Sequence, residues 1–368
     1  MTFFENKTPS EVLFAKSDKP VATLRRFHMI HKKQLFAYVL LWVAMAVLLV
    51  SGMENVNSLR EYPSVSLRYD KPISGKVAYS ARQYSIEHDG ENTFWLTFWH
   101  ETKAEYEADH NSTAAACILF SGDAAVVWPA RYLAGVAPSV IDGVGCMVSS
   151  ALAGELWGGY DIVGKSVEVD NEPRVVRGVF ESTELLALVA VKDEDTSQSF
   201  SAVELTGGPA NATRSDAEGF AIAAGLGQPG SVLMGTPVSF SAILAILPLL
   251  ILIIYSLALC YSKFKFHRTV LRIVLLLSFF GFALLLPVLL DMLPDWVIPT
   301  RWSDFSFWGE LANRLGDNLR EYLVLSPLLR DVEYKILLYK QIGIAFLSVS
   351  CSLFICFSVA RMNNKITR

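Results

Sequence analysis

The stretch Leu35–Ser51 reads LFAYVLLWVAMAVLLVS and contains no charged side chain. Three further apolar runs follow at Phe240–Tyr261, Val270–Leu290 and Ile336–Val359. A helix rises about 1.5 Å per residue, so roughly 20 apolar residues suffice to cross the hydrocarbon core of a bilayer. The pattern predicts four transmembrane helices, one before and three after a long segment of ordinary polarity.

The composition agrees with a membrane protein. Hydrophobic residues make up 52% of the 368 residues and the mean hydropathy is +0.36. Charged residues fall to 18%, below the ~25% of soluble proteins. The first apolar run starts behind a polar stretch and lacks a small-residue cleavage site, which favours a retained anchor over a signal peptide. We expect membrane lipids as partners, and a net charge of −4 does not suggest nucleic acid.

Basic residues predict the orientation of the spans. Lysine and arginine flank them before residue 34, between the second and third runs, and after residue 360, whereas the segment between the third and fourth runs is rich in aspartate and glutamate. Cytoplasmic loops carry the excess of basic residues. Both termini of this multi-pass protein are therefore expected in the cytoplasm, with the long segment outside the membrane.

The spans divide the chain into nine parts. These are a cytoplasmic tail (1–33), the first span (34–53), an extracytoplasmic domain (54–237), the second span (238–261), a short cytoplasmic loop (262–268), the third span (269–290), an extracytoplasmic aromatic and amphipathic segment (291–334), the fourth span (335–360) and a cytoplasmic tail (361–368). Tryptophan prefers the membrane interface, so we expect the segment 291–334 to lie along the outer leaflet. A lid or docking face beneath the domain is the alternative.

The extracytoplasmic domain has the pattern of an α+β fold with a mostly antiparallel sheet. Strands are predicted at Thr93–His100, Leu185–Val191 and Ala202–Leu205, and a hairpin from Ser166–Val169 to Arg174–Phe180. Helical spacing of apolar residues occurs within Ser139–Trp157, where Ser149 or Ser150 is a plausible N-cap. A second helix is predicted at Ser215–Ala224, opened by a capping box from Ser215 to Glu218.

One part of this domain contains a family-like motif. The stretch Val148–Phe180 reads VSSALAGELWGGYDIVGKSVEVDNEPRVVRGVF. A serine pair, a helix ending in Leu-Trp-Gly, a strand opened by Val-Gly-Lys and a strand closed by Gly-Val-Phe follow one another, and the order resembles the extracytoplasmic core domain of MacB/FtsX-like permeases of the ATP-binding-cassette (ABC) class. The matching positions are Leu152, Ala153, Trp157, Gly158, Gly164, Lys165, Gly178 and Val179.

The arrangement of one span before the domain and three after it is also that of the MacB/FtsX-like family. The resemblance implies a permease-like subunit in a bacterial inner or plasma membrane, paired as a homo- or heterodimer. It further implies a separate ABC ATPase subunit that moves the extracytoplasmic domain against an outside protein or substrate. The alternative is a non-transporting, membrane-anchored envelope binding or sensor protein.

In the MacB/FtsX-like family the ATPase is contacted by a cytoplasmic segment between spans two and three. In this chain that segment is short, at about two helical turns. It alternates aromatic and basic residues, which also suits an interfacial anchor, and both interpretations stay open. The candidate contact residues are Lys263, Phe264, Lys265, Phe266, His267 and Arg268.

No enzymatic site is predicted. The chain has neither a Gly-x-x-x-x-Gly-Lys-Ser/Thr phosphate loop nor a nucleophile elbow. His88, His100 and His110 lie among acidic residues but without the spacing of metal ligands, so a solvated acidic face is the simpler interpretation. We therefore expect no catalytic, cofactor or metal site, and any ATP hydrolysis would belong to a partner.

Two cysteines fall in the predicted extracytoplasmic domain, Cys117 and Cys146. An oxidising compartment would permit a disulfide between them. The sequence has no spacing signature that favours the bond over two separate packing residues, so both alternatives stay open.

Overall fold

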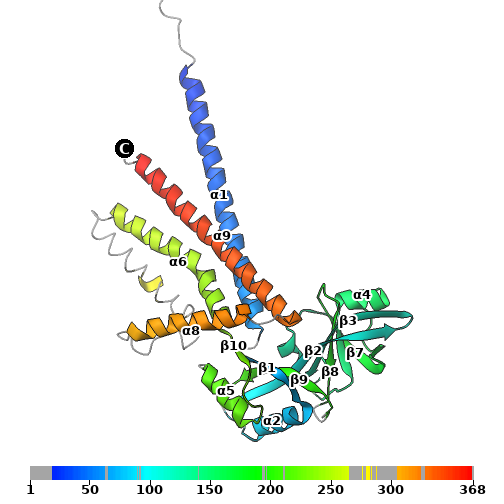
Figure 1. Ribbon diagram of the computed structural model, residues 1–368. Helices are drawn as coiled ribbons and strands as arrows, with labels where there is room; N and C mark the ends of the chain where they lie inside the picture. The colour runs from blue at the N-terminus through cyan, green and yellow to red at the C-terminus, as the bar shows by residue number, and fades with distance from the viewer. Residues whose placement is uncertain are drawn as a thin grey trace, which may run out of the picture.

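A computed structural model describes residues 19–62, 65–88, 90, 93–139, 141–192, 195, 197–209, 212–264, 276, 279–281, 283, 287, 305–324 and 328–366. The folded domain lies at one end of a group of long helices, which diverge away from it (Figure 1). The C-terminal end of the chain lies on the far side of these helices from the domain (Figure 1).

Three of the described helices are long and apolar enough to cross a membrane: α1 (Lys19–Arg60), α6 (Thr236–Phe264) and α9 (Leu329–Ile366). They coincide with the first, second and fourth predicted spans. The predicted third span, 269–290, lies largely outside the described residues. The first helix also starts earlier and ends later than expected, so that residues 19–33 of the predicted tail are helical.

The domain is built on one ten-stranded sheet. In chain order the strands are β1 (Val65–Ser74), β2 (Phe94–Ala108), β3 (Asn111–Ser121), β4 (Tyr132–Gly135), β5 (Gly145–Ser149), β6 (Ser166–Val169), β7 (Glu172–Phe180), β8 (Leu186–Ala190), β9 (Ser199–Gly207) and β10 (Ser231–Met234). Their spatial order is β10-β1-β9-β2-β3-β8-β5-β7-β4, with β6 pairing β2 and β7. The pairs β3–β8 and β5–β7 are parallel and the other described pairs antiparallel, which confirms the predicted sheet.

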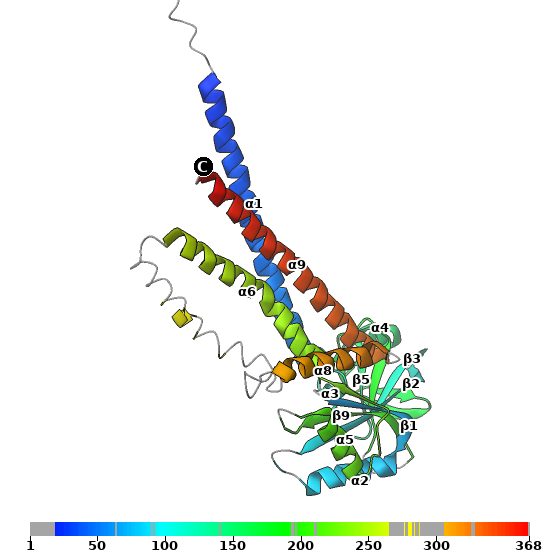
Figure 2. The same ribbon diagram turned by 60° about the vertical axis from the view of Figure 1, so that its left-hand side comes forward.

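Short helices cover the sheet at its two ends (Figures 1 and 2). Those at the ends are α2 (Gly75–Glu87), α4 (Ser150–Trp157) and α5 (Arg214–Ala223), while α3 (Ala124–Val127) packs near the middle, on β2, β3 and β9. One apolar cluster packs beneath α2 and α5, and a second packs around α4. A longer helix, α8 (Phe305–Val324), crosses between the domain and the membrane helices. This position leaves both alternatives for the segment 291–334 open, an interfacial helix or a docking face.

The predicted hairpin is confirmed. Val169 of β6 faces Glu172 of β7, and the two residues between them, Asp170 and Asn171, have φ values of 50° and 67°. Positive φ at both central positions defines the type I′ turn, whose twist matches that of the flanking strands. Asp170 also accepts the backbone N–H of Glu105 at 2.8 Å, which ties the turn to β2.

The predicted cap at Ser149 is confirmed, but the apolar run before it is a strand, and the capping box of the second helix is displaced. Residues 145–149 form the strand β5, and the helix α4 begins only at Ser150, capped by the Ser149 hydroxyl. Every residue of β5 is buried, because Cys146 and Val148 belong to the cluster around α4 and Met147 to another cluster on the opposite face. A short apolar run of this kind can be a buried strand or part of a buried helix. The capping box predicted from Ser215 to Glu218 lies two residues earlier: Thr213 is the N-cap of α5 and Asp216 its partner in the first turn.

Gly178 of β7 lies where the backbone after β4 approaches closely, at the edge of the sheet. A Cβ atom at this position would lie 2.7 Å from the carbonyl oxygen of Val136, whereas a Cβ at Gly154 in α4 would meet nothing within 4 Å. We expect Gly178→Ala to lower the free energy of unfolding of the full-length protein by about 1–3 kcal/mol. Gly154→Ala should leave it unchanged or raise it slightly, because alanine favours helix.

Thermal unfolding in detergent, followed by tryptophan fluorescence, measures both variants. Equal midpoints for Gly178→Ala and Gly154→Ala would contradict the close approach.

Candidate functional site

Four charged side chains meet where the last membrane helix reaches the domain. Arg68 lies on β1, Glu204 on β9, and Arg330 and Asp331 in the first turn of α9. Their exposed fractions are 7% for Arg68, 0% for Glu204, 4% for Arg330 and 6% for Asp331. Two cations and two anions give a formal charge of zero. We call these four residues the buried ion network.

One carboxylate oxygen is the centre of the buried ion network. Glu204 Oε1 lies 2.8 Å from Arg330 Nη1 and 3.2 Å from Arg68 Nη1. The same oxygen accepts the indole N–H of Trp99 at 2.8 Å and the hydroxyl of Ser66 at 2.7 Å. Asp331 completes the network through Arg68 Nη2 at 2.9 Å. Arg68 therefore bridges a carboxylate of the sheet and a carboxylate of the membrane helix.

The strand register explains why these groups converge. Ser66 of β1 lies directly opposite Glu204 of β9. Residues two apart on a strand share a face, so Arg68 points to the same side as Ser66. On the other flank of β9, Thr97 of β2 pairs with Glu204, and Trp99 lies two residues further along the same face. One face of three adjacent strands thus holds every domain group of the network.

Aromatic rings enclose the two guanidinium groups. The Trp99 ring centre lies 4.8 Å from Arg68 Cζ and 5.4 Å from Arg330 Cζ. Tyr62, just beyond the end of α1, also lies 5.4 Å from Arg330 Cζ, and its ring contacts Tyr334 of α9 at 5.0 Å. Cation–π attraction is strongest for desolvated pairs, at about 2 kcal/mol. The first and last membrane helices therefore meet the domain at one place.

The domain also anchors the start of α9 through hydrogen bonds. The backbone N–H of Leu329, the first residue of α9, donates to Glu101 Oε2 at 2.6 Å. Arg330 Nε donates to the carbonyl oxygen of Val127 at 2.6 Å. The first N–H groups of a helix have no partner inside the helix, and its N-terminus favours negative charge. A carboxylate of β2 thus satisfies the end of a membrane helix.

Burial and charge act in opposite directions on the site's titratable groups. Burial disfavours the charged form of Arg68, but Asp331 and Glu204 outweigh it and hold the pKa of the guanidinium above its ordinary value. Burial raises the pKa of Glu101; the Leu329 N–H opposes this rise and Asp331 adds to it. We call the contact between the domain and the start of α9 the joint. On its domain side Arg68 stays charged, and the carboxyl of Glu101 is easier to protonate than an exposed one.

Both carboxylates of the buried ion network have a second oxygen, Glu204 Oε2 and Asp331 Oδ2, that is buried without a hydrogen-bond partner among the described residues. Such a network costs desolvation energy, and apolar residues of similar size are often as stabilising as a buried ion pair. The buried ion network therefore acts mainly by fixing the orientation of α9 on the sheet. Any other arrangement would leave a buried charge without its partner.

The helix α8 is fastened to both sides of the joint. Its Tyr322 hydroxyl donates to the carbonyl oxygen of Met234 in β10 at 3.1 Å, and its ring stacks on Tyr334 of α9 at 5.5 Å. Glu321 of α8 forms an ion pair with Arg214 at the start of α5. Movement of α8 would therefore pull on the domain and on the last membrane helix together.

A second set of polar contacts joins the membrane helices just below the domain. Asn55 Nδ2 of α1 donates to Gln341 Oε1 of α9 at 3.2 Å, and Gln341 Nε2 donates to the carbonyl oxygen of Ser241 in α6 at 3.2 Å. All three residues are buried. Polar side chains at such depth commonly hold helices together, so α1, α6 and α9 form one unit at the domain end.

The predicted ATPase contact is not tested by the structure. The helix α6 continues through Lys263 and Phe264, whose side chains are not described, and Lys265, Phe266, His267 and Arg268 lie outside the described residues. The helical course to Phe264 shortens the predicted loop by three residues, 262–264. Whether this segment binds an ATPase or only the membrane surface stays a prediction.

The residues that carry the family-like motif are structural. Leu152, Ala153 and Val179 are buried, and Trp157 packs against the cluster around α4. Gly158 ends α4 with a φ of 70°, a left-handed conformation that favours glycine. Gly164 and Lys165 form the turn into β6 through the hydrogen bond from Lys165 N–H to Ile162 O at 3.0 Å. These residues hold the domain together at a distance from the buried ion network.

The disulfide considered between Cys117 and Cys146 is absent, since both thiols are free and buried. Cys117 is on β3 and Cys146 on β5, and β8 lies between these strands. Two strand spacings separate their backbones by about 9.6 Å, beyond the ~7 Å that a disulfide spans. Burial raises the pKa of the Cys117 thiol to about 11 and that of Cys146 to about 12. Both cysteines act as apolar packing residues.

Sequence reasoning missed the buried ion network. It counted Asp331 and its neighbouring arginine only as charges outside the membrane. One signal was present: Glu204 is the single charged residue in the apolar run Ala202–Leu205, and a lone carboxylate in a buried strand requires a cation nearby. Nothing in the sequence identified which arginine that would be. Among the described residues no group of three metal-ligating side chains occurs.

No family model matches the chain, and no curated protein sequence matches it. Solved structures do show similarity. The extracellular domain of the noncanonic ABC-type transporter YknZ from Gram-positive bacteria matches at 13% identity and a TM-score of 0.37, covering 46% of this chain and 97% of that one. The periplasmic region of MacB from Actinobacillus actinomycetemcomitans matches at 10% identity and a TM-score of 0.38, covering 46% and 87%.

These two structures are similar to this chain over less than half of its length, and nothing about its activity or partners follows from the likeness.

Removing one member of the buried ion network should unbalance the charge of the rest. Glu204→Gln leaves two buried guanidinium groups with one carboxylate, so we expect a loss of about 3–5 kcal/mol in the free energy of unfolding. The double variant Glu204→Gln/Arg330→Met should lose less than the sum of its single variants, because the two residues share one interaction. Denaturant unfolding of the full-length protein in detergent measures each value, and Glu155→Gln, at an exposed site in α4, is the control. Additive losses would show that Glu204 and Arg330 are not coupled.

The raised pKa of Glu101 predicts a pH dependence. The folded protein holds a proton here at pH values where the unfolded chain has lost it, so this stabilisation is complete below the ordinary pKa and is lost as pH rises through the raised pKa. The melting temperature of the unaltered protein relative to Glu101→Gln should therefore rise as pH falls from about 7 to about 5. Glu107→Gln, an exposed carboxyl of the same strand, controls for removal of an acid. A constant difference would contradict the effect of burial on Glu101.

Proposed function

We propose that this chain is the permease-like membrane subunit of a MacB/FtsX-type ABC transporter or mechanotransmission complex. In this proposal a separate ATPase subunit moves the membrane helices, and the extracytoplasmic domain moves with them. Two copies of this chain, or this chain and a similar one, would pair around the ATPase. The domain would then act on a protein or substrate outside a bacterial inner or plasma membrane.

The observation that supports this proposal is the buried ion network. The sheet reaches α9 through Arg68, Glu204, Arg330 and Asp331, all nearly inaccessible to solvent. A flexible linker would let the domain and the helix move independently, whereas desolvated charges resist separation because each would be left unpaired. The joint is therefore suited to passing a tilt of α9 to the sheet as one rigid movement.

The same joint would also serve the alternative, a membrane-anchored envelope binding protein or sensor that carries a signal inward. The two functions differ at the cytoplasmic end, where only the transport proposal requires an ATPase. Phe264 and Phe266 are the residues predicted to separate them, since aromatic side chains at a short loop either enter a groove of the ATPase or lie in the membrane interface.

Affinity purification of the full-length protein from its own cells in mild detergent tests the proposal. An ABC ATPase subunit should co-purify in stoichiometric amount, and Phe264→Ala/Phe266→Ala should lose most of it while the protein remains inserted and folded. Glu204→Gln should retain the ATPase but lose the activity of the complex, because the joint and not the cytoplasmic contact is altered. Purification without any ATPase, from cells in which one is expressed, would support the sensor.

A further inference from the structure

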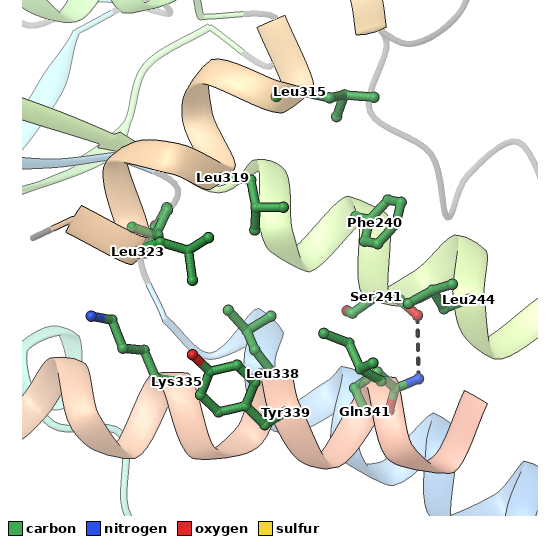
Figure 3. Close-up of a pocket in the computed structure, with 13 residues that line it drawn as sticks. Phe240, Ser241, Leu244, Leu315, Leu319, Leu323, Lys335, Leu338, Tyr339 and Gln341 are labelled. Atoms are coloured by element: carbon green, nitrogen blue, oxygen red, sulfur yellow. Dashed lines mark hydrogen bonds between the residues drawn. The ribbon is translucent and has the colours of Figure 1, made fainter. Parts of the chain in front are cut away.

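A groove lies on the membrane side of the joint, between α6, α8 and α9 (Figure 3). Its volume is about 190 Å³. Leu244 of α6, Leu315 and Leu319 of α8, and Leu338 and Ile342 of α9 contribute its walls. The side chains of three helices thus enclose an apolar space from three sides, which differs from the convex apolar surface that a membrane helix ordinarily presents.

The groove offers little to water. Two of its polar lining residues are already hydrogen-bonded to each other: Gln341 Nε2 donates to the backbone carbonyl oxygen of Ser241, as the dashed line in Figure 3 shows. Gln341 also accepts a hydrogen bond from Asn55. A water molecule inside a protein needs two to four polar partners, and cavities lined by aliphatic side chains stay dry. The occupant that fits these walls is therefore a hydrocarbon.

The groove is placed where hydrocarbon is the surrounding medium. Two of its walls belong to α6 and α9, whose candidate spans have hydropathies of 2.8 and 2.3. The third wall, α8, crosses over the domain end of those helices (Figures 1 and 2). Along α9 the lining runs from Lys335 to Ile342, a length of about 10 Å at the rise of a helix. A narrow apolar slot of this length fits a segment of extended chain.

The polar end of the slot carries a positive charge. Lys335 lies at the end of the groove towards the start of α9, the end that faces the domain (Figure 3). A lysine near the end of a membrane helix places its ammonium group at headgroup level. A lipid whose chain lies between the three helices would have its phosphate at this level. The ammonium group of Lys335 and the apolar groove beside it therefore match the headgroup and the acyl chain of a phospholipid.

We propose that this groove binds one acyl chain of an outer-leaflet phospholipid, with the lipid phosphate at Lys335. The bound chain fills the space between α8 and the two spans, and it touches Tyr322, whose hydroxyl joins α8 to β10. The lipid thereby holds α8 against α6 and α9 beside the joint. Lipid binding of this kind requires no ATPase, and it holds for a permease subunit and for a sensor alike.

Gly316 allows the groove to be filled without disturbing the helix. It lines the groove, and a Cβ added there would meet no atom within 4 Å. Gly309 lies two turns earlier in α8, also has no atom within 4 Å of an added Cβ, and does not line the groove. Gly316→Leu therefore places an isobutyl group in the acyl-chain site, and Gly309→Leu is the matched control for the same change in the same helix.

The test uses the full-length protein in nanodiscs that contain phosphatidylglycerol with a diazirine in one acyl chain. After illumination, peptide mass mapping should locate the label on groove residues such as Leu319 and Ile342, above its level on the exposed Phe346 and Phe354 of α9. Gly316→Leu should lower the groove label about tenfold, equivalent to about 1.4 kcal/mol of binding, while Gly309→Leu should not. Equal labelling in both variants, or uniform labelling of α9, would overturn the site.

The headgroup half of the proposal has its own measurement. Diacylglycerol with the same diazirine chain lacks the phosphate, so it should label the groove less than phosphatidylglycerol in the unaltered protein. Lys335→Gln should remove this difference and leave Gly316→Leu sensitivity intact. Equal labelling of the groove by both lipids in the unaltered protein would overturn the role of Lys335. Absence of lipid label on the groove residues would overturn the lipid site itself.

Discussion

The carboxylate of Glu204 has no access to water, and the rest of the architecture depends on how it is compensated. A buried, ionised carboxylate is stable only beside a cation and hydrogen-bond donors. Arg68 comes from the neighbouring strand, but the shorter contact, at 2.8 Å, comes from Arg330 of the last membrane helix. The buried carboxylate of the sheet is therefore neutralised in part by Arg330, a residue of a membrane helix. This ion pair fixes the position of the start of α9 relative to β9.

That single constraint explains the grouping of other contacts at the same spot. Tyr62 and Tyr334 join the end of α1 to α9, and Glu101 accepts the first N–H of α9. Each contact would contribute little if the start of α9 were mobile, because forming it would then cost the conformational entropy of ordering that segment. With α9 already positioned by the ion network, the remaining contacts add rigidity at little further cost. A rigid joint between membrane helices and a folded domain is what the proposed permease-like subunit requires.

The acyl-chain groove and the ion network lie on opposite sides of the same joint. Tyr322 belongs to both neighbourhoods: it lines the groove, stacks on Tyr334 and donates to Met234. On the membrane side, α8 packs against α6 and α9 through apolar side chains. On the domain side, α9 is held to the sheet by buried ion pairs. The helix α8 is held between these two media, and a lipid that enters or leaves the groove would change how firmly it connects them.

The spans at Leu35–Ser51, Phe240–Tyr261 and Ile336–Val359, the mixed sheet and the Asp170–Asn171 turn were readable in the sequence, because each depends on composition or on neighbours a few residues apart. The strand β5, directly before the predicted cap at Ser149, was missed, since burial on both faces of a short strand erases its alternating pattern. Glu204 could have been suspected, but its partner Arg330 lies far along the chain, beyond α6 and the predicted third span. Local chemistry thus settled the elements, while the pairing of distant charges and the groove beneath α8 depend on three-dimensional packing, which no short-range pattern encodes.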